Sequence, residues 1–337
     1  MDAICWHSSA INWRPPSPDT GNSPMIVTVT PNTSMDMTYF IPAWEINRTL
    51  RASRVLNSIG GKPTDASYIL GEMQIPSLAL GFSAGMTGET ITGFLTSKGV
   101  TVDFVPVAGE SRRNLIIVCT DGSGQTAITA DSLITTDADL DVLRARYLTA
   151  LETATCVVLG GTLPKTMRPD YYTDFVALAR QRDVPVVLDA VEPNLSAGLV
   201  SRPNYCKPNQ DELSQFAGMR VETFDDAYRV GRTMIERYGT QPIITFGDQG
   251  GLAVLHDRAY RIPPLPVTVE SAAGAGDAVL AGITASVAAR QPIEDGIRLG
   301  FAAATAVVIM PGTAECRKAD IDIFLPQIEL IPFTPAQ

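Results

Sequence analysis

A glycine-rich turn that ends in an acid is the stretch of the chain best suited to chemistry. It reads Gly274-Ala275-Gly276-Asp277, and mostly small and apolar residues follow without a proline to about residue 290. This pattern predicts a turn that opens a buried helix, whose unpaired N–H groups can bind an anion such as a phosphate. Asp277 would repel a phosphate unless it has a task, and accepting a proton from an attacking hydroxyl is such a task. The alternative is that Asp277 only caps the helix.

The elements that would position this turn alternate along the chain. Apolar strands are predicted at 26–30, 76–82, 155–159, 184–189, 242–246 and 251–256, and helices at 64–73, 87–98, 137–151, 170–182, 211–217, 224–238, 276–290 and 294–309. Apolar strands that alternate with helices predict an α/β fold with a mostly parallel sheet covered on both faces. In such sheets ligands bind beyond the carboxyl ends of the strands.

Two extended regions, at about 37–56 and 112–130, interrupt this alternation and contain β-forming residues. We expect them to form a small β-sheet that lies over the site as a lid. The folded domain should span residues 25–330, followed by a C-terminal tail at 331–337. Residues 1–24 are rich in Pro, Ser and Asn and lack periodicity, which predicts a disordered N-terminal extension.

Composition excludes several classes of partner. The chain has 337 residues and a formal net charge of −10, which argues against nonspecific binding to nucleic acid or to an anionic membrane. No segment is long and apolar enough to suggest a membrane span. Five cysteines are scattered without a C-x-x-C pair, as expected of a cytoplasmic protein.

The turn at 274–277 resembles the second signature of the ribokinase/PfkB family of sugar kinases, which reads D-T-x-G-A-G-D. Its last four residues match, whereas Ser271, Ala272 and Ala273 replace D-T-x. Further family motifs occur in family order between residue 26 and about residue 315. The nearest branch is that of 1-phosphofructokinase and tagatose-6-phosphate kinase, which implies a ribokinase-like fold.

The resemblance implies a sugar-binding side of the site. Asp36 matches the Asp of N-P-A-x-D, which holds sugar hydroxyls, and Gly60, Gly61 and Lys62 match G-G-K, which leads to a sugar and its phosphate. Asp65 replaces an asparagine that donates to the sugar, and a carboxylate cannot donate. Pro63 also departs from the pattern by replacing a glycine. The residues implied for the phosphate of the substrate are Lys62, Arg112 (from T-R-x-N), Thr162 (from G-S-L-P) and, by a looser alignment, Arg51 from the lid.

The resemblance also implies a nucleotide-binding side. Lys207-Pro208-Asn209 with Glu212 matches K-P-N-x-x-E, in which Lys207 faces nucleotide phosphate while Asn209 and Glu212 organise Mg²⁺ through water. The strand-end residue Asp189 should lie near these groups. The nucleotide should also contact Thr245, Gly247 and Gly250 in a turn, and Gly274 and Gly276 at the helix start.

Taken together, these motifs predict an ATP- and Mg²⁺-dependent kinase of a phosphorylated ketohexose. Asp277 would be the base, and the N–H groups of Gly274, Ala275 and Gly276 would stabilise the transferring phosphoryl group. Family members dimerise through the lid, so a homodimer is expected. One alternative is a non-catalytic sugar- or nucleotide-binding protein of the same fold, which the departures Pro63, Asp65, Ala272 and Ala273 favour. Another is a kinase of an unphosphorylated sugar or of a nucleoside.

Overall fold

The structure is a computed structural model that describes residues 25–131 and 133–336, so the predicted extension at 1–24 lies outside it. Its main sheet is built from β1 (Met25–Thr30), β4 (Ser77–Ser83), β5 (Thr101–Pro106), β10 (Ala154–Gly160), β11 (Val186–Asp189), β12 (Tyr205–Cys206), β13 (Gln241–Thr245), β14 (Gly251–Val254), β15 (Ala259–Ile262) and β16 (Ile331–Pro332). Their order is β16-β15-β14-β13-β12-β11-β10-β1-β4-β5. Neighbours from β13 to β5 run parallel and those from β13 to β16 run antiparallel, which confirms the predicted mostly parallel sheet.

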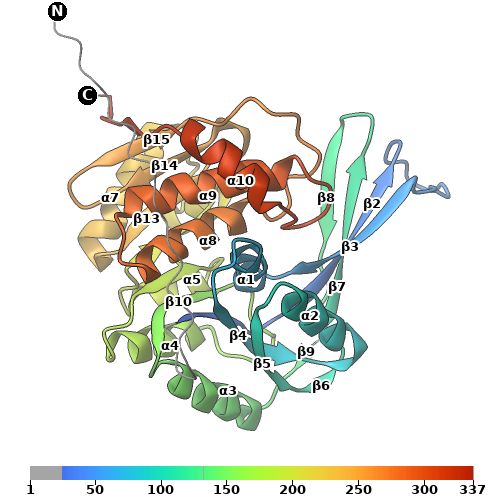
Figure 1. Cartoon of the computed structure of the whole chain (residues 1–337), viewed down its shortest axis with the longest axis horizontal. Helices are drawn as coiled ribbons and strands as arrows, with labels where there is room; N and C mark the ends of the chain where they lie inside the picture. Colours follow the sequence, from blue (N-terminus) through green and yellow to red (C-terminus); the bar gives the residue numbers. More distant parts are fainter. Residues whose placement is uncertain (1–24, 132, 337) are drawn as a thin grey trace, which may run out of the picture.

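Helices cover both faces of this sheet (Figure 1). They are α1 (Lys62–Glu72), α2 (Gly85–Ser97), α3 (Asp137–Ala150), α4 (Tyr171–Arg180), α5 (Asn194–Leu199), α6 (Gln210–Ala217), α7 (Phe224–Tyr238), α8 (Ala275–Ala288), α9 (Ile293–Val308) and α10 (Lys318–Phe324), with single 3₁₀ turns at η1 (Gly247–Gln249) and η2 (Leu325–Gln327). In β10, Val157 and Leu159 belong to one buried hydrophobic cluster with residues of α3, α4, α5 and α7, while Cys156 and Val158 belong to another with residues of α1, α8, α9 and α10. Both faces of the strand are therefore buried, as its continuous apolar run requires.

Helix α8, which carries the glycine turn, is held against α9 by glycines on both helices. A Cβ at Gly282 would lie 2.2 Å from the backbone nitrogen of Gly300, and one at Gly300 would lie 2.7 Å from the carbonyl oxygen of Val279. The two backbones can approach this closely because neither position has a side chain. Their packing fixes the direction in which the N-terminus of α8 points.

A second sheet occupies the two regions predicted as a lid and extends from one side of the body (Figure 1). It has the order β3-β2-β7-β8, built from β2 (Ser34–Ile41), β3 (Arg54–Gly60), β7 (Arg112–Cys119) and β8 (Gly124–Ile128). Strand β2 pairs with β3 antiparallel and with β7 in parallel. The lid strands therefore differ from the predicted ranges, since β2 begins at Ser34 and β3 only at Arg54. Residues 42–53, which include Pro42 and the left-handed Asn47, connect them as a loop.

Smaller elements complete the described chain. β6 (Ala108–Gly109) and β9 (Leu133–Ile134) form a separate two-stranded antiparallel pair. The segment predicted as a C-terminal tail begins within the main sheet, because β16 pairs with β15 and Phe333 packs near Tyr228. None of the helices between residues 25 and 336, residue 132 aside, has the length and apolarity needed to cross a membrane.

Candidate active site

The glycine turn opens helix α8 as predicted. Gly274 caps the helix in the left-handed region (φ 83°), and no side chain caps the N-terminus. A Cβ at Gly274 would lie 2.4 Å from the backbone nitrogen of Ala314, and one at Gly276 would lie 3.2 Å from Nζ of Lys207. The helix start is thus bare of side chains and has an ammonium group beside it. This combination suits a phosphate oxygen.

Asp277 lies in the first turn of α8, and its pKa is raised to about 7. Burial is the main cause, and the negative charge of Asp189 adds to it. The ammonium groups of Lys207 and Lys62 act in the opposite direction, as does a hydrogen bond with Asp65. A carboxylate with a pKa near neutrality is well matched to accepting a proton from a hydroxyl.

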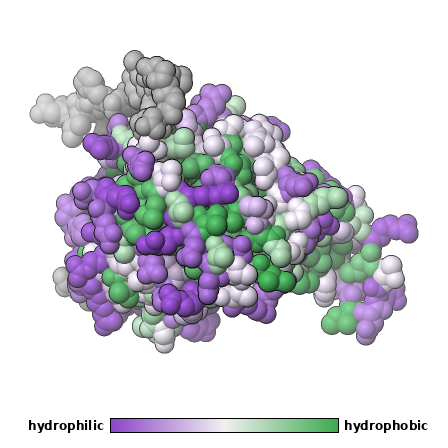
Figure 2. Space-filling model, turned by 90° about the horizontal axis from the view of Figure 1, so that it is seen from below, coloured by the Kyte–Doolittle hydropathy of each residue, from purple (hydrophilic) through white to green (hydrophobic). Residues whose placement is uncertain are grey.

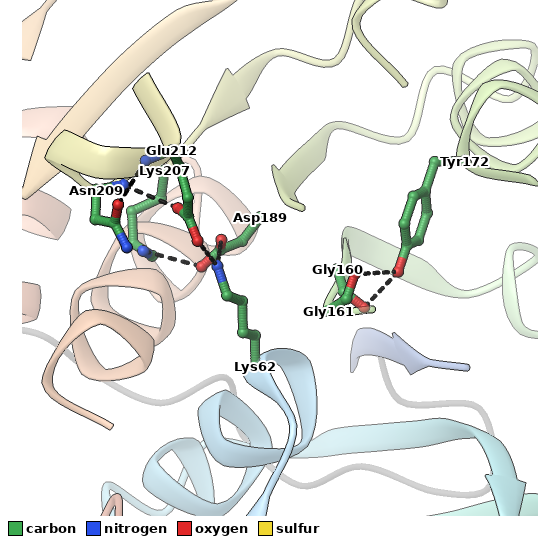
Figure 3. A network of polar contacts seen from close by, with 8 residues as sticks. All are labelled: Lys62, Gly160, Gly161, Tyr172, Asp189, Lys207, Asn209 and Glu212. Atoms are coloured by element: carbon green, nitrogen blue, oxygen red, sulfur yellow. Dashed lines mark hydrogen bonds and ion pairs between the residues drawn. The ribbon is translucent and has the colours of Figure 1, made fainter. Parts of the chain in front are cut away.

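The charged groups that act on Asp277 belong to a largely buried ion network of Lys62, Asp189, Lys207 and Glu212 (Figure 3). Nζ of Lys62 contacts Oδ1 of Asp189 at 2.6 Å and Oε1 of Glu212 at 2.5 Å, and Nζ of Lys207 contacts Oδ2 of Asp189 at 3.0 Å. Burial alone would raise the pKa of Asp189, but the two lysines outweigh it and lower that pKa. Lys62, at the start of α1, therefore points toward carboxylates from β11 and α6. That it binds the phosphate of the sugar stays a prediction.

Asn209 and Glu212 form a capping box at the start of α6. Oδ1 of Asn209 accepts from the Glu212 backbone N–H at 2.8 Å, and Oε2 of Glu212 accepts from the Asn209 N–H at 2.9 Å. Glu212 is nonetheless buried and its Oε1 contacts Lys62, so the N-x-x-E spacing caps the helix and also places Glu212 in the ion network. Within residues 25–131 and 133–336, no three acidic, His or Cys side chains gather in a way that could hold a metal ion. A metal here would need water or phosphate oxygens as further ligands.

The turn after β13 lies next to α6. The backbone N–H of Thr245 donates to the carbonyl oxygen of Pro208. Thr245 and Asn209 form an isolated parallel β-bridge. Gly247 and Gly250 have φ angles of 54° and 86°. A Cβ at Gly250 would lie 2.0 Å from the Ile262 carbonyl oxygen, so this turn cannot carry a side chain there. The predicted nucleotide residues thus converge at the carboxyl ends of β11, β12 and β13.

The predicted sugar residues gather where the lid meets the body. Oδ1 of Asp36 accepts from Nδ2 of Asn114 at 2.8 Å, and its Oδ2 accepts from Oγ1 of Thr313 at 3.1 Å. Burial raises the pKa of Asp36, and these hydrogen bonds partly offset the rise. A Cβ at Gly60 would lie 2.4 Å from Oδ1 of Asp36, so the glycine leaves room for the acid. Gly61, with φ 108°, then turns the chain into α1.

Arg112 begins β7, and its Nε is buried with no hydrogen-bond partner in the described part of the chain. Burial lowers the pKa of Arg112, while the charges of Asp36, Asp131 and Asp65 oppose that change. A buried N–H without a partner lowers the stability of the fold, because it has lost its hydrogen bonds to water. An anionic ligand bound by the guanidinium group would supply the missing partner. Arg51, the looser candidate, lies exposed in the loop between β2 and β3.

Thr162 follows β10 and accepts a hydrogen bond from Nδ2 of Asn32 at 3.2 Å. The loop that carries it is shaped by Tyr172, whose hydroxyl donates to the carbonyl oxygens of Gly160 and Gly161 at 2.5 and 3.1 Å (Figure 3). Oδ1 of Asn32 is buried and has no partner among the described residues. Asn32 therefore lies next to Thr162, one of the residues predicted for the sugar side.

Sequence reasoning missed Asn32, Asn114 and Thr313. The first two had a signal, because each is the asparagine of a family motif, N-P-A-x-D or T-R-x-N. Thr313 lies in a loop after α9 that reaches the lid, where its backbone N–H also donates to Oγ of Ser58 at 3.0 Å. No local pattern of residues indicates that contact across 277 positions.

Comparisons with known proteins find relatives and solved structures that are named as sugar kinases. The chain is 28% identical over 282 residues to a 1-phosphofructokinase of Bacillus subtilis, covering 84% of this chain and 92% of that protein. It is 26% identical over 317 residues to a tagatose-6-phosphate kinase of Staphylococcus epidermidis, covering 91% and 99%. The crystal structure of a possible 1-phosphofructokinase from Thermotoga maritima superposes with a TM-score of 0.83 at 26% identity, covering 92% and 100%. Phosphofructokinase-2 from Escherichia coli, at 23% identity and covering 90% and 99%, shares the fold with a TM-score of 0.82.

These relatives phosphorylate alcohol groups of sugars, which makes the chain a phosphotransferase with an alcohol acceptor. The family model that matches describes the pfkB family of carbohydrate kinases and spans residues 33–320. The α/β fold, the bare start of α8 and the acid beside it agree with that assignment. The chain belongs to the pfkB carbohydrate kinase family.

Proposed function

We propose that the protein transfers the γ-phosphoryl group of ATP to a primary hydroxyl of a phosphorylated ketohexose, of the fructose-1-phosphate or tagatose-6-phosphate type. One observation carries the reaction: Asp277, with a pKa of about 7, lies in the first turn of a helix whose start is bare of side chains. The names of the relatives support the substrate class.

In the reaction, the sugar oxygen forms a bond to the γ-phosphorus while the bond from that phosphorus to the β–γ bridging oxygen breaks. The hydroxyl proton passes to Asp277, and ADP leaves with the bridging oxygen. The N–H groups of Gly274, Ala275 and Gly276 stabilise the charge on the transferring group, and Lys207 beside Gly276 adds to this stabilisation.

Mg²⁺ would be held by Asn209 and Glu212 through water, and it supplies positive charge to the nucleotide phosphates. Their donor set fits this role, because Mg²⁺ retains waters and binds few carboxylates. Lys62 balances the charge of Asp189 and Glu212, which keeps this acidic pair from repelling a nucleotide. Thr245, Gly247 and Gly250 present backbone to the nucleotide at the adjoining turn.

On the sugar side, Asp36 and Asp65 hold hydroxyl groups, with Gly60 and Gly61 allowing close approach of the backbone. Arg112, Thr162 and Lys62 hold the phosphate that the sugar already carries. The lid excludes water from the site and so limits hydrolysis of ATP. The same lid exposes apolar side chains, for which a second copy of the chain is the proposed partner.

A second substrate class has one observation in its favour. Lys62 is already paired with two carboxylates. Of the two cations predicted for the sugar phosphate from these motifs, Arg112 is the one with a buried N–H that has no partner among the described residues. An unphosphorylated sugar or a nucleoside needs fewer cations than a sugar phosphate does. Arg112 itself favours the phosphorylated substrate, because its guanidinium group matches the geometry of a phosphate.

The experiment that tests this function measures ADP release with Mg²⁺ and ATP over a panel of ketohexose phosphates, free sugars and nucleosides. We expect turnover with a ketohexose phosphate and a KM at least tenfold lower than with the matching free sugar. Turnover with only a free sugar or a nucleoside would move the activity to the second class. Binding without turnover on any compound would support the non-catalytic alternative.

A further inference from the structure

Helix α1 places a second acid, Asp65, against the acid at the start of α8. Only 3% of Asp65 is exposed, and its Oδ1 has no hydrogen-bond partner in the described part of the chain. Asp277 lies within hydrogen-bonding reach of it. Two buried carboxyl groups in contact cannot both stay ionised at low cost. A single proton shared between the two carboxyl groups removes one of the two charges and makes a hydrogen bond between them possible.

We propose that Asp65 stays protonated and donates a hydrogen bond to Asp277, so that it acts as a neutral stand-in for the asparagine of the family pattern and positions the base. This inference rests on the proposed role of Asp277. The expectation that Asp65 cannot donate assumed an ionised carboxylate. A protonated carboxyl group has one O–H donor, as the neutral amide of asparagine has N–H donors.

The charges around the pair favour this distribution of the proton. Asp65 faces Asp277 from α8, Asp36 from β2 and Arg112 from β7, and burial together with the two acids raises its pKa well above the ordinary value. The lysines Lys62 and Lys207, by contrast, favour the charged form of Asp277. The negative charge of the pair therefore belongs on Asp277.

The other elements that pack on α1 add no charge that changes this result. Strands β1, β4 and β10 contain no charged residue, and β1 contributes hydroxyl groups, with Thr28 contacting Ser67 and Thr30 contacting Thr64. The charged residue of α2, Glu89, is exposed. Arg54 of β3 is also exposed and lies over the ring of Phe40.

The proton balance during the reaction follows directly. Asp65 keeps its own proton throughout, while Asp277 gains the proton of the sugar hydroxyl and later returns it to water. The pair carries one negative charge before the transfer rather than two. A phosphorylated sugar therefore meets about half the repulsion that two carboxylates would exert at the same distance.

A substrate-free test compares the pH dependence of the melting temperature in wild type, Asp65→Asn and the control Asp141→Asn, whose acid is exposed on α3. A folded-state pKa above that of the unfolded chain costs stability as pH rises between the two values. As pH rises between the unfolded-state and the folded-state pKa of Asp65, the melting temperature of Asp65→Asn should increase relative to that of wild type by about 2 °C per pH unit. Above the folded-state pKa this difference should stay constant. The Asp141→Asn variant should keep a constant offset. A constant offset for Asp65→Asn as well would overturn the proposal.

A second test uses turnover, with Asp65→Ala and Asp65→Asn measured from pH 6 to pH 10. Wild-type kcat should fall at high pH as Asp65 loses its proton, whereas Asp65→Asn should lack this basic limb. Asp65→Ala removes the donor, and its kcat should lie at least about tenfold below that of Asp65→Asn. Equal kcat values for both variants, or a basic limb that survives in Asp65→Asn, would overturn the proposal. If no sugar is turned over, the melting experiment still decides the state of Asp65, so the two failures can be told apart.

Discussion

Asp277 lies at a helix start that is suited to an anion, and its pKa is raised to about 7. Replacement by asparagine keeps the position but removes the group that can accept a proton. The amide preserves the shape of the side chain but cannot accept the proton. We expect kcat to fall on the order of 10²–10⁴-fold, as is usual when a general base is lost. The Kd values for substrate and for Mg²⁺-ATP should stay near those of wild type, because a neutral amide repels phosphate less. Single-turnover kinetics and calorimetric titration measure the two quantities.

The same acid should also determine how activity depends on pH. A base must be deprotonated to act, so kcat/KM of the wild type should decrease about tenfold per pH unit below a pKa near 7. The control variant Asp141→Asn should keep this acid limb. Residual turnover in Asp277→Asn should be flat over the same range. A wild-type profile that is flat between pH 5 and pH 8 would contradict the assignment of Asp277 as the base.

Arg112 and its neighbour Arg113 offer a matched pair of variants, because only Arg112 is predicted to bind a ligand. Nε of Arg112 is buried and has no hydrogen-bond partner among the described residues, which indicates a role in ligand binding, whereas Nε of Arg113 donates to Oγ1 of Thr87 at 2.9 Å. We expect Arg112→Ala to raise KM for the sugar phosphate tenfold or more with little change in KM for ATP. Arg113→Ala should leave both KM values within about twofold. Equal losses for both substrates in Arg112→Ala would move this residue to the nucleotide side or to a structural role.

The positions of the candidate residues could be predicted because each follows a strand or opens a helix. The charge state of these residues could not. Lys62 finds its partners Asp189 and Glu212 at separations of 127 and 150 positions, and only the fold brings them together. The ionisation of Asp65 likewise depends on Asp277 and Asp36, which belong to other elements.

Helix starts in this chain show which features serve the fold alone. Capping boxes occur on α3 (Thr136 with Asp139), on α6 (Asn209 with Glu212) and on α7 (Thr223 with Asp226). Replacement of each cap by alanine should cost about 0.5–2 kcal/mol in the free energy of unfolding. Only Asn209→Ala should also raise KM for Mg²⁺-ATP, by tenfold or more, since it alone adjoins the lysine network. Urea unfolding and steady-state kinetics on Thr136→Ala, Asn209→Ala and Thr223→Ala provide the comparison. A KM change of the same size in all three would reduce Asn209 to a structural cap.

The long periodic elements were predicted well, and α7 begins and ends at the predicted residues. Elements that depend on distant partners were missed. Strand β5 has alternating and partly exposed residues, and it exists because it pairs with β4 at the edge of the sheet. The first lid strand begins earlier than predicted, because β2 pairs with β3 on one side and with β7 on the other, and both pairings extend back to Ser34.

Hydrogen bonds join the lid to a loop near the C-terminal end of the chain, and we expect them to couple substrate binding to the position of the lid. Thr313, from the loop between α9 and α10, donates through its hydroxyl to Asp36 and through its backbone N–H to Ser58. Asp36 is at the same time a proposed ligand of the sugar. Asp36 on β2 is already linked through Thr313 to Ser58 on β3. Sugar hydroxyls that bind Asp36 would therefore act on the contact between the lid and this loop, and we expect sugar binding and lid closure to depend on one another.

Exposed apolar side chains on the lid argue for its proposed role in dimer formation. Trp44, Ile46, Val55 and Ile128 are exposed there, and the lid projects from the body with hydrophobic residues among hydrophilic ones at its end (Figure 2). Every residue of β8 is exposed, which leaves its outer edge free to pair with another strand. A second lid is a self-complementary partner for such a surface.

We therefore expect a dimer in solution at micromolar concentration and predict that Ile128→Lys on β8 shifts it toward monomer. A lysine on an exposed edge strand opposes pairing with another strand. The matched control is Val200→Lys, which places the same charge at an exposed apolar position just after α5, far from the lid in sequence. Light scattering coupled to gel filtration measures the mass of each variant. Kinetics should show a higher KM for the sugar in the Ile128→Lys monomer, because a lid without its partner closes less firmly over the site. A dimer that survives Ile128→Lys but is lost in Val200→Lys would place the interface on the body instead.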